Sequence, residues 1–269
     1  MVYVCKPFWV GICMDELKIT SSKNHQYFCN TLILMMKIQK EQSFAEKVIN
    51  FNRNLNYSGD LPDGFQVLNP YLDNPETMQV MQQFYHKYYN DTNTRKFIIG
   101  INPSRNGAGV TGVPFTDTKR LESVCGIPMY SAHTHEISSV FVYDMIQDFG
   151  SVTDFYRQFY INSPFPLAIV KRSKEGNFLN ANYYDDKKLF ESVKGFMIAS
   201  LEKHISLGLD TSEVFILGKK NAEFLTKLNK EKTLFDKMTV LEHPRYIQQY
   251  KSKEKQLYID KYILALSGM

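Results

Sequence analysis

Two side chains able to do chemistry, Asn102 and His243, each follow a short apolar segment and each precede a proline. Proline has no N–H to continue a strand ladder and disfavours helix before it, so each segment is predicted to be a strand that stops at the polar residue. Ligands of α/β sheets collect beyond the carboxyl ends of the strands. A lone histidine is more often structural than catalytic, but an amide at a neighbouring strand end favours a site. We therefore expect Asn102 and His243 to face one crevice.

The segment after Asn102 is rich in glycine. Gly107, Gly109 and Gly112 stand within six residues, which lets the backbone approach a ligand closely. No Gly-Lys-Ser/Thr follows, so this is not a Walker loop, and without a regular strand-to-helix turn it matches the dinucleotide fingerprint only weakly. From the residues alone, a ligand-holding loop and a plain Gly-rich connection capped by Asn102 both stay open.

Alternating helices and strands are predicted from about residue 42 onward. The helices are expected at residues 43–53, 75–89, 138–147, 189–205 and 254–266, with two more beginning near Thr118 and Asn221. Asn74 followed by Pro75 is a typical helix start. Short apolar runs predict strands at residues 96–101, 159–162, 214–218 and 239–241. Residues 56–71, punctuated by Gly and Pro, are predicted to be a loop.

Four buried strands separated by helices predict an α/β fold, a three-layer α/β/α sandwich around a four-stranded, mainly parallel central sheet. Residues 41–269 are expected to form this domain. Residues 1–40 hold the only Trp and show no sustained helical or strand period. They are predicted to be a poorly ordered N-terminal extension, with a specific N-terminal arm as the alternative.

The composition is typical of a folded protein. Hydrophobic residues make up 43% of the chain, and the net charge of +4 is too small by itself to indicate nucleic acid. The four cysteines match neither a disulfide framework nor a Cys-x-x-Cys metal motif. No run approaches the roughly 20 apolar residues of a membrane span, and the N-terminus is a poor signal peptide. We expect a cytoplasmic protein with no membrane segment, no metal and no cofactor.

Two motifs and the stretch between them resemble the uracil-DNA glycosylase superfamily. Residues 100–117 resemble its first motif, with the Gly-hydrophobic-Asn-Pro start and the Thr-Gly-Val-Pro-Phe end of the single-strand-selective monofunctional branch. His243-Pro244-Arg245 resembles the second, His-Pro motif, and residues 155–167 (FYRQFYINSPFPL) resemble the intervening stretch without gaps. The resemblance covers roughly residues 42–269 and looks closest to a bacterial second subfamily of that branch.

The resemblance implies a glycosylase of base-excision repair, which hydrolyses the N-glycosidic bond of a flipped-out deaminated base in DNA. Asn102 would hold or polarise the attacking water, and His243 would stabilise negative charge on the departing base. Phe115 would stack on that base. The implied base-binding residues are Gly100, Ile101, Pro103, Phe115, Asn162 and Ser163.

The base-reading position departs from the family pattern. In the gapless match the family's base-reading Asn falls on Ser163, with Asn162 one place earlier. A hydroxyl discriminates less sharply than an amide, and Asn162 could supply the amide only if the strand were offset by one, which would turn its side chain to the other face. Ser104, where the related motif commonly has Gly, is a second departure that could narrow the pocket. The preferred base therefore stays open between uracil, xanthine and other deaminated bases.

Contacts to the DNA backbone are expected from the His-Pro segment and from basic residues. Pro244, Arg245 and Tyr246 would form a loop that fills the space left by the flipped base, with a phosphate contact by Arg245 as the alternative. A helix N-terminus near Asn221 could receive a phosphate. The other predicted DNA-contacting residues are Ser104, Arg105, Lys171, Lys219 and Lys220.

Two other function classes stay open. One is a nucleotide or phosphoester hydrolase that uses the Gly-rich loop, although it would lack a P-loop lysine and a metal carboxylate pair. The other is a non-catalytic DNA-binding module of the same fold, against which the presence of both Asn102 and His243 argues. Asp117, Glu136 and Asp144 are predicted to be structural, because none stands at a predicted strand end. The expected partner is DNA with a damaged base, bound by a monomer.

Overall fold

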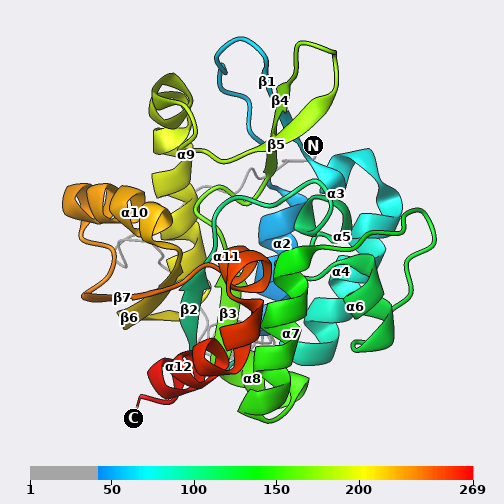
Figure 1. Ribbon diagram of the computed structural model, residues 1–269, viewed down its shortest axis with the longest axis vertical. Helices are drawn as coiled ribbons and strands as arrows, with labels where there is room; N and C mark the ends of the chain where they lie inside the picture. The colour runs from blue at the N-terminus through cyan, green and yellow to red at the C-terminus, as the bar shows by residue number, and fades with distance from the viewer. Residues whose placement is uncertain (1–41, 269) are drawn as a thin grey trace, which may run out of the picture. The chain divides into compact units, whose positions relative to one another are not determined.

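A computed structural model describes residues 42–268 of the protein (Figure 1). Its central sheet has four strands in the order β3-β2-β6-β7. The strands are β2 (Arg95–Ile99), β3 (Phe159–Asn162), β6 (Leu209–Leu217) and β7 (Lys237–Leu241). All three strand pairs are parallel, so this sheet is wholly parallel where a mainly parallel one was expected. The predicted N-terminal extension, residues 1–40, lies outside the described residues.

Helices cover both faces of the central sheet (Figure 1). Phe97 of β2 and Tyr160 of β3 point to one face, where both rings pack against His204 of α9. Phe159 of β3 points to the other face, against Phe149 of α7. The first face is covered by α2 (Phe44–Arg53), α9 (Lys187–Ser206) and α10 (Lys219–Lys232), and the second by α7 (Ile137–Phe149), α8 (Val152–Gln158) and α12 (Lys255–Ser267). The predicted three-layer α/β/α sandwich is confirmed.

Capping residues explain where the first helices begin. Ser43 and Glu46 form a reciprocal capping box at the start of α2, which satisfies two backbone N–H groups that the helix cannot pair. The Asn74 side chain accepts a hydrogen bond from the Glu76 N–H at the start of α4 (Pro75–Tyr88). Both helices lie where the sequence predicts them.

The His-Pro segment is helical, which corrects the predicted loop at Pro244–Tyr246. His243 is the N-cap of α11 (Pro244–Tyr250), and Pro244 stands at the first helical position, which suits its fixed φ and missing N–H. Arg245 and Tyr246 therefore project from a helical turn. The Gly-rich segment likewise contains a short helix, α5 (Ala108–Thr111), before α6 (Thr118–Ser123). Within residues 42–268, no helix is long and apolar enough to cross a membrane.

The structure contains a second, antiparallel sheet that the sequence did not predict. It has the order β1-β4-β5, built from β1 (Phe65–Leu68), β4 (Ala168–Arg172) and β5 (Phe178–Ala181). The prediction of a loop at residues 56–71 is therefore wrong over β1 and over α3 (Pro70–Asp73). β1 pairs with a strand about 100 residues away, Phe65 opposite Lys171, and such a non-local pairing leaves no local pattern in a four-residue segment.

Candidate active site

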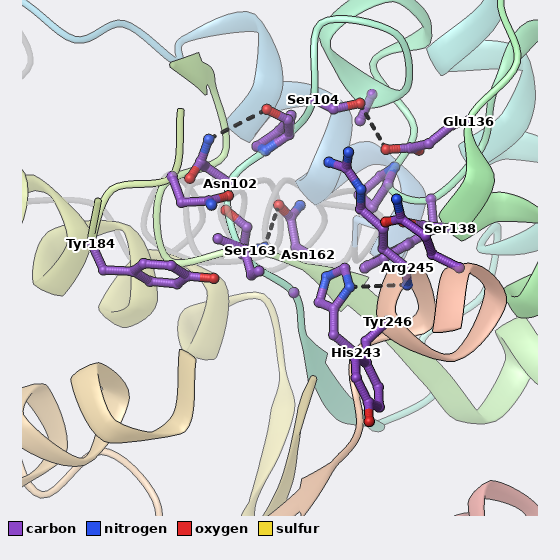
Figure 2. A pocket seen from close by; sticks show the side chains of 18 of the residues that line it. Asn102, Ser104, Glu136, Ser138, Asn162, Ser163, Tyr184, His243, Arg245 and Tyr246 are labelled. Atoms are coloured by element: carbon purple, nitrogen blue, oxygen red, sulfur yellow. Dashed lines mark hydrogen bonds between the residues drawn. The ribbon is translucent and has the colours of Figure 1, made fainter. Parts of the chain in front are cut away.

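A pocket of about 300 Å³ lies at the carboxyl ends of β2, β3 and β7 (Figure 2). The predicted site residues that line it are Gly100, Ile101, Asn102, Pro103, Ser104, Phe115, Asn162, Ser163, His243, Arg245 and Tyr246. Residues that the sequence did not predict also line it, among them Glu136, Ser138, Asn182, Tyr184, Gln249 and Tyr250. The two chemically active candidates, Asn102 and His243, thus share one pocket, as parallel strand ends at one sheet edge require.

The Asn102 amide is held in one orientation by backbone groups at the end of β5 and just after it. Its Nδ2 donates to the carbonyl of Ala181 at 2.8 Å, and its Oδ1 accepts from the N–H of Tyr183 at 2.9 Å. An amide oxygen has two lone pairs, so one is left to accept a hydrogen bond from water. The second sheet therefore fixes the amide that the first sheet presents.

His243 is held as a neutral ring. Its Nδ1 accepts a hydrogen bond from the N–H of Arg245 at 3.1 Å, which leaves the ring proton on Nε2. Burial lowers the pKa of His243 to about 4, and the positive charge of Arg245 acts in the same direction. At neutral pH the ring is therefore uncharged and offers Nε2–H as a donor.

Phe115 is held by a strained backbone and a close glycine. Its φ of 52° is in the left-handed region, which costs on the order of 1 kcal/mol for a residue with a side chain. Its ring packs on Gly100 so closely that a Cβ there would stand 2.8 Å from the ring. The ring centroid is 5.9 Å from that of His243. The absence of a side chain at Gly100 therefore lets the Phe115 ring lie beside the His243 imidazole.

Asn162 and Ser163 differ in what they offer the pocket. The Asn162 Nδ2 donates to the Tyr160 hydroxyl at 2.7 Å, and its Oδ1 accepts from the N–H of Ser163 at 2.9 Å. These bonds hold the amide beside Tyr160, on the face of the sheet that α9 covers. The Ser163 Oγ accepts from the N–H of Phe165 at 3.0 Å, so its hydroxyl proton stays available to a ligand. Ser163 therefore offers the pocket a free hydroxyl proton, whereas the Asn162 amide is held beside Tyr160.

Several predicted DNA-contacting residues lie outside this pocket. Lys171 is exposed on β4, with its Nζ 4.9 Å from the centroid of the Phe65 ring. Lys220 is exposed at the start of α10, with its Nζ 4.7 Å from the centroid of Tyr184, which lines the pocket. The rest of this group comprises Arg105 and Lys219, both exposed, and Pro244, which is buried in the first turn of α11.

Asn221 lies in the first turn of α10, whose N-terminus is the predicted phosphate site. Its side chain is fully buried, and its Nδ2 lies within hydrogen-bond distance of the carbonyls of Ile99, Gly100 and Leu217. Its Oδ1 accepts from the hydroxyl of Tyr183. Asn221 therefore ties the ends of β2 and β6 to the segment that holds Asn102. The only sequence signal was a polar residue in the first turn of a helix after a buried strand.

Glu136 reaches the pocket although it follows no strand. Its Oε1 accepts from the Ser104 hydroxyl at 2.7 Å, and Figure 2 shows the two side chains pointing toward one another. Burial raises the pKa of Glu136, the bond from Ser104 and the charge of Arg245 oppose that rise, and Asp117 adds to it. Among the described residues, no group of three or more His, Cys, Asp or Glu side chains could hold a metal ion.

A parallel-sheet sandwich that carries an amide after β2 and a neutral imidazole after β7, at the same edge of the sheet, matches a known class of protein. The family model of the uracil DNA glycosylase superfamily matches residues 86–267, and the chain belongs to that superfamily. The chain is similar to the crystal structure of wild-type Pedobacter heparinus SMUG2, with 48% sequence identity and a TM-score of 0.82 over 84% of this chain and 97% of that one. The predicted place in the single-strand-selective branch is confirmed by this match. None of the curated proteins matches the chain.

Proposed function

We propose that the protein is a monofunctional DNA glycosylase of base-excision repair. It hydrolyses the N-glycosidic bond of a deaminated base flipped out of DNA, with uracil as the first candidate substrate and xanthine as the second. The observation that carries this proposal is the shared pocket of Asn102, whose amide is fixed, and His243, whose ring is a neutral donor. Membership of the uracil DNA glycosylase superfamily supports the same class of reaction.

Asn102 acts on the nucleophile. With Oδ1 already bonded to the N–H of Tyr183, its remaining lone pair accepts a hydrogen bond from the water that attacks the sugar carbon. An amide is too weak a base to take the proton early, so the reaction depends on departure of the base. Because water is the nucleophile, the product is an abasic site in an intact strand.

His243 acts on the leaving base. As the glycosidic bond breaks, the bonding electron pair goes to the base, and negative charge develops on a carbonyl oxygen of the base. The Nε2–H of His243 donates to that oxygen, while the Phe115 ring stacks on the base and the Ser163 hydroxyl bonds its edge. A neutral donor suits this task because it needs no counter-charge to bind an uncharged base.

The first turns of α11 supply the surface that meets DNA. Arg245 and Tyr246 line the pocket with Gln249 and Tyr250, and the two Tyr side chains are 44% and 68% exposed. Their ring centroids are 5.8 Å apart, so they form an aromatic edge one helical turn long. We infer that this edge takes the space beside the flipped nucleotide, since bases stack readily on aromatic rings.

The test is base release from oligonucleotides that carry one uracil, one xanthine or one hypoxanthine, read as strand cleavage after alkali. Wild type is compared with His243→Ala and Asn102→Ala, both expected to lose about a hundredfold or more of the rate. Release by wild type with intact strands before alkali, and its loss in both variants, is the expected result. If folded wild type binds these oligonucleotides but releases no base, the catalytic proposal is wrong and a binding module remains.

A further inference from the structure

Glu136 is a partly buried carboxylate in the pocket wall that the proposed reaction does not use. It stands at the N-cap of α7 but makes no capping bond with its side chain. Its Oε1 instead accepts from the Ser104 hydroxyl, at the start of the Gly-rich segment, at 2.7 Å. Even partial burial removes water from a carboxylate, so the place of Glu136 beside this loop needs an explanation.

The backbone of the same residue holds the other end of that segment. The N–H of Glu136 donates to the Asp117 Oδ2 at 2.7 Å. Asp117 is fully buried and caps α6, and it also accepts from the Ser139 hydroxyl at 2.8 Å. Residue 136 therefore bonds to both ends of the loop, Ser104 through its side chain and Asp117 through its backbone.

The middle of the loop is fitted to the carboxylate as well. A Cβ added at Gly107 would stand 2.1 Å from the Glu136 Oε2, a distance at which something must move. The N–H groups of Gly107 and Gly109 both donate to the carbonyl of Ser104, so the turn that Glu136 touches is closed on itself. Asn102 lies two residues before Ser104, and Phe115 lies two residues before Asp117.

We propose that Glu136 is a positioning residue for base release. Its hydrogen bonds to Ser104 and Asp117 fix the Gly-rich loop, and the loop in turn holds Asn102 and Phe115 in place in the pocket. This inference rests on the proposed function for its kinetic consequence. Misplacement of a reacting group by about 1 Å can lower a rate a hundredfold even when the substrate still binds. Loss of the Ser104 bond therefore affects the chemical step more than DNA affinity.

The kinetic test compares Glu136→Ala, Glu136→Gln and Ser104→Ala under single-turnover conditions on uracil-containing DNA. Glu136→Ala and Ser104→Ala are expected to lower the rate about tenfold to a hundredfold, with affinity for an oligonucleotide carrying a non-cleavable 2′-fluoro uridine within about threefold of wild type. Glu136→Gln keeps an oxygen that accepts from Ser104, so its rate stays within about threefold. The double variant Glu136→Ala, Ser104→Ala falls no further than either single one. Glu122→Ala, at an exposed carboxylate of α6, is the control.

Two outcomes overturn the inference. One is a wild-type rate in both Glu136→Ala and Ser104→Ala. The other is a Glu136→Gln rate as low as that of Glu136→Ala, which would mean that the charge and not the Ser104 bond matters. Thermal unfolding identifies a variant that fails to fold, and Ser104→Ala then carries the test.

A second readout needs no catalysis. The side-chain amide signals of Asn102 in ¹⁵N spectra of the DNA-free protein are expected to move in Glu136→Ala and Ser104→Ala, and to stay near their wild-type positions in Glu136→Gln. Unmoved Asn102 signals in both alanine variants would contradict the inference. If wild type releases no base, the proposed function is wrong, and these signals still decide whether Glu136 positions Asn102.

Discussion

At the scale of single residues, the site depends on side chains whose orientation other groups have already fixed. The Asn102 amide bonds to Ala181 and Tyr183, and His243 accepts from the N–H of Arg245. These bonds leave one group on each residue available to a ligand. On Asn102 it is a lone pair of the amide oxygen, and on His243 it is the Nε2–H. Such preorganised dipoles need not reorient as charge develops, which is the condition for strong electrostatic stabilisation.

His243 is expected to stay neutral from about pH 5 to 8, because burial lowers its pKa to about 4 from the ordinary value near 6.5. Its ring signals in NMR spectra should show the Nε2–H form and no titration in that range. Since the folded state disfavours the proton, the stability that the neutral ring contributes is complete above about pH 6.5 and is lost as the pH falls towards about 4. A ring that titrates near pH 6.5 in the folded protein would contradict this, and the denatured protein is the control.

At the scale of elements, the start of α10 fastens two strands and the segment after β5. Gly218, with φ of 100°, turns the chain from β6 into the helix and places Asn221 in its first turn. The Asn221 amide then meets the carbonyls at the ends of β2 and β6 and the hydroxyl of Tyr183. The strand ends that carry the site are therefore held by side-chain bonds as well as by the sheet ladder.

Asn221→Ala is expected to lower the free energy of unfolding by about 2–4 kcal/mol, because it leaves several buried groups without a partner. The base-release rate should fall as well, since the segment that holds Asn102 loses its anchor. Tyr183→Phe is the matched comparison: it removes one bond of the same set and should cost about 1 kcal/mol. Urea unfolding measures both. Equal losses in the two variants would show that the strand-end bonds of Asn221 contribute nothing.

At the scale of the whole molecule, residues from both sheets come together around one pocket. The parallel sheet supplies Asn102, Ser163 and His243 at its carboxyl edge, while β5 of the antiparallel sheet leads to Ala181 and Tyr183. Helix α11 adds an exposed, partly aromatic edge beside this pocket. Because the net charge is only +4, the electrostatic attraction to DNA in the proposed function depends on where the Lys and Arg side chains lie on the surface.

DNA affinity is expected to fall with salt, with a log–log slope of about −0.9 for each phosphate that a cation neutralises on duplex DNA. Lys220, beside Tyr184 at the start of α10, is predicted to be one such cation. Lys220→Ala should therefore reduce the slope by about 1. Lys232→Ala, at the other end of the same helix, should leave it unchanged. Equal slopes for the two variants in a fluorescence-anisotropy titration would refute a phosphate contact by Lys220.

Local sequence patterns are sufficient to predict the central sheet and the residues at its edge. Apolar runs before Asn102 and His243 predict strands, and the prolines after these two residues indicate where the strands stop. Such signals are local, since they depend on the period and punctuation of neighbouring residues. The three-layer fold and the family resemblance could therefore be predicted before any tertiary contact was known.

The way in which those residues are held depends on contacts between distant parts of the chain. The bond between Ser104 and Glu136 joins residues 32 apart in the sequence, that between Asn102 and Tyr183 joins residues 81 apart, and that between Asn221 and Gly100 joins residues 121 apart. Glu136 follows no strand and β1 is only four residues long, so local patterns did not identify either one. The physical reason is that these groups gain their roles from hydrogen bonds to distant backbone and side chains, which exist only after the chain has folded.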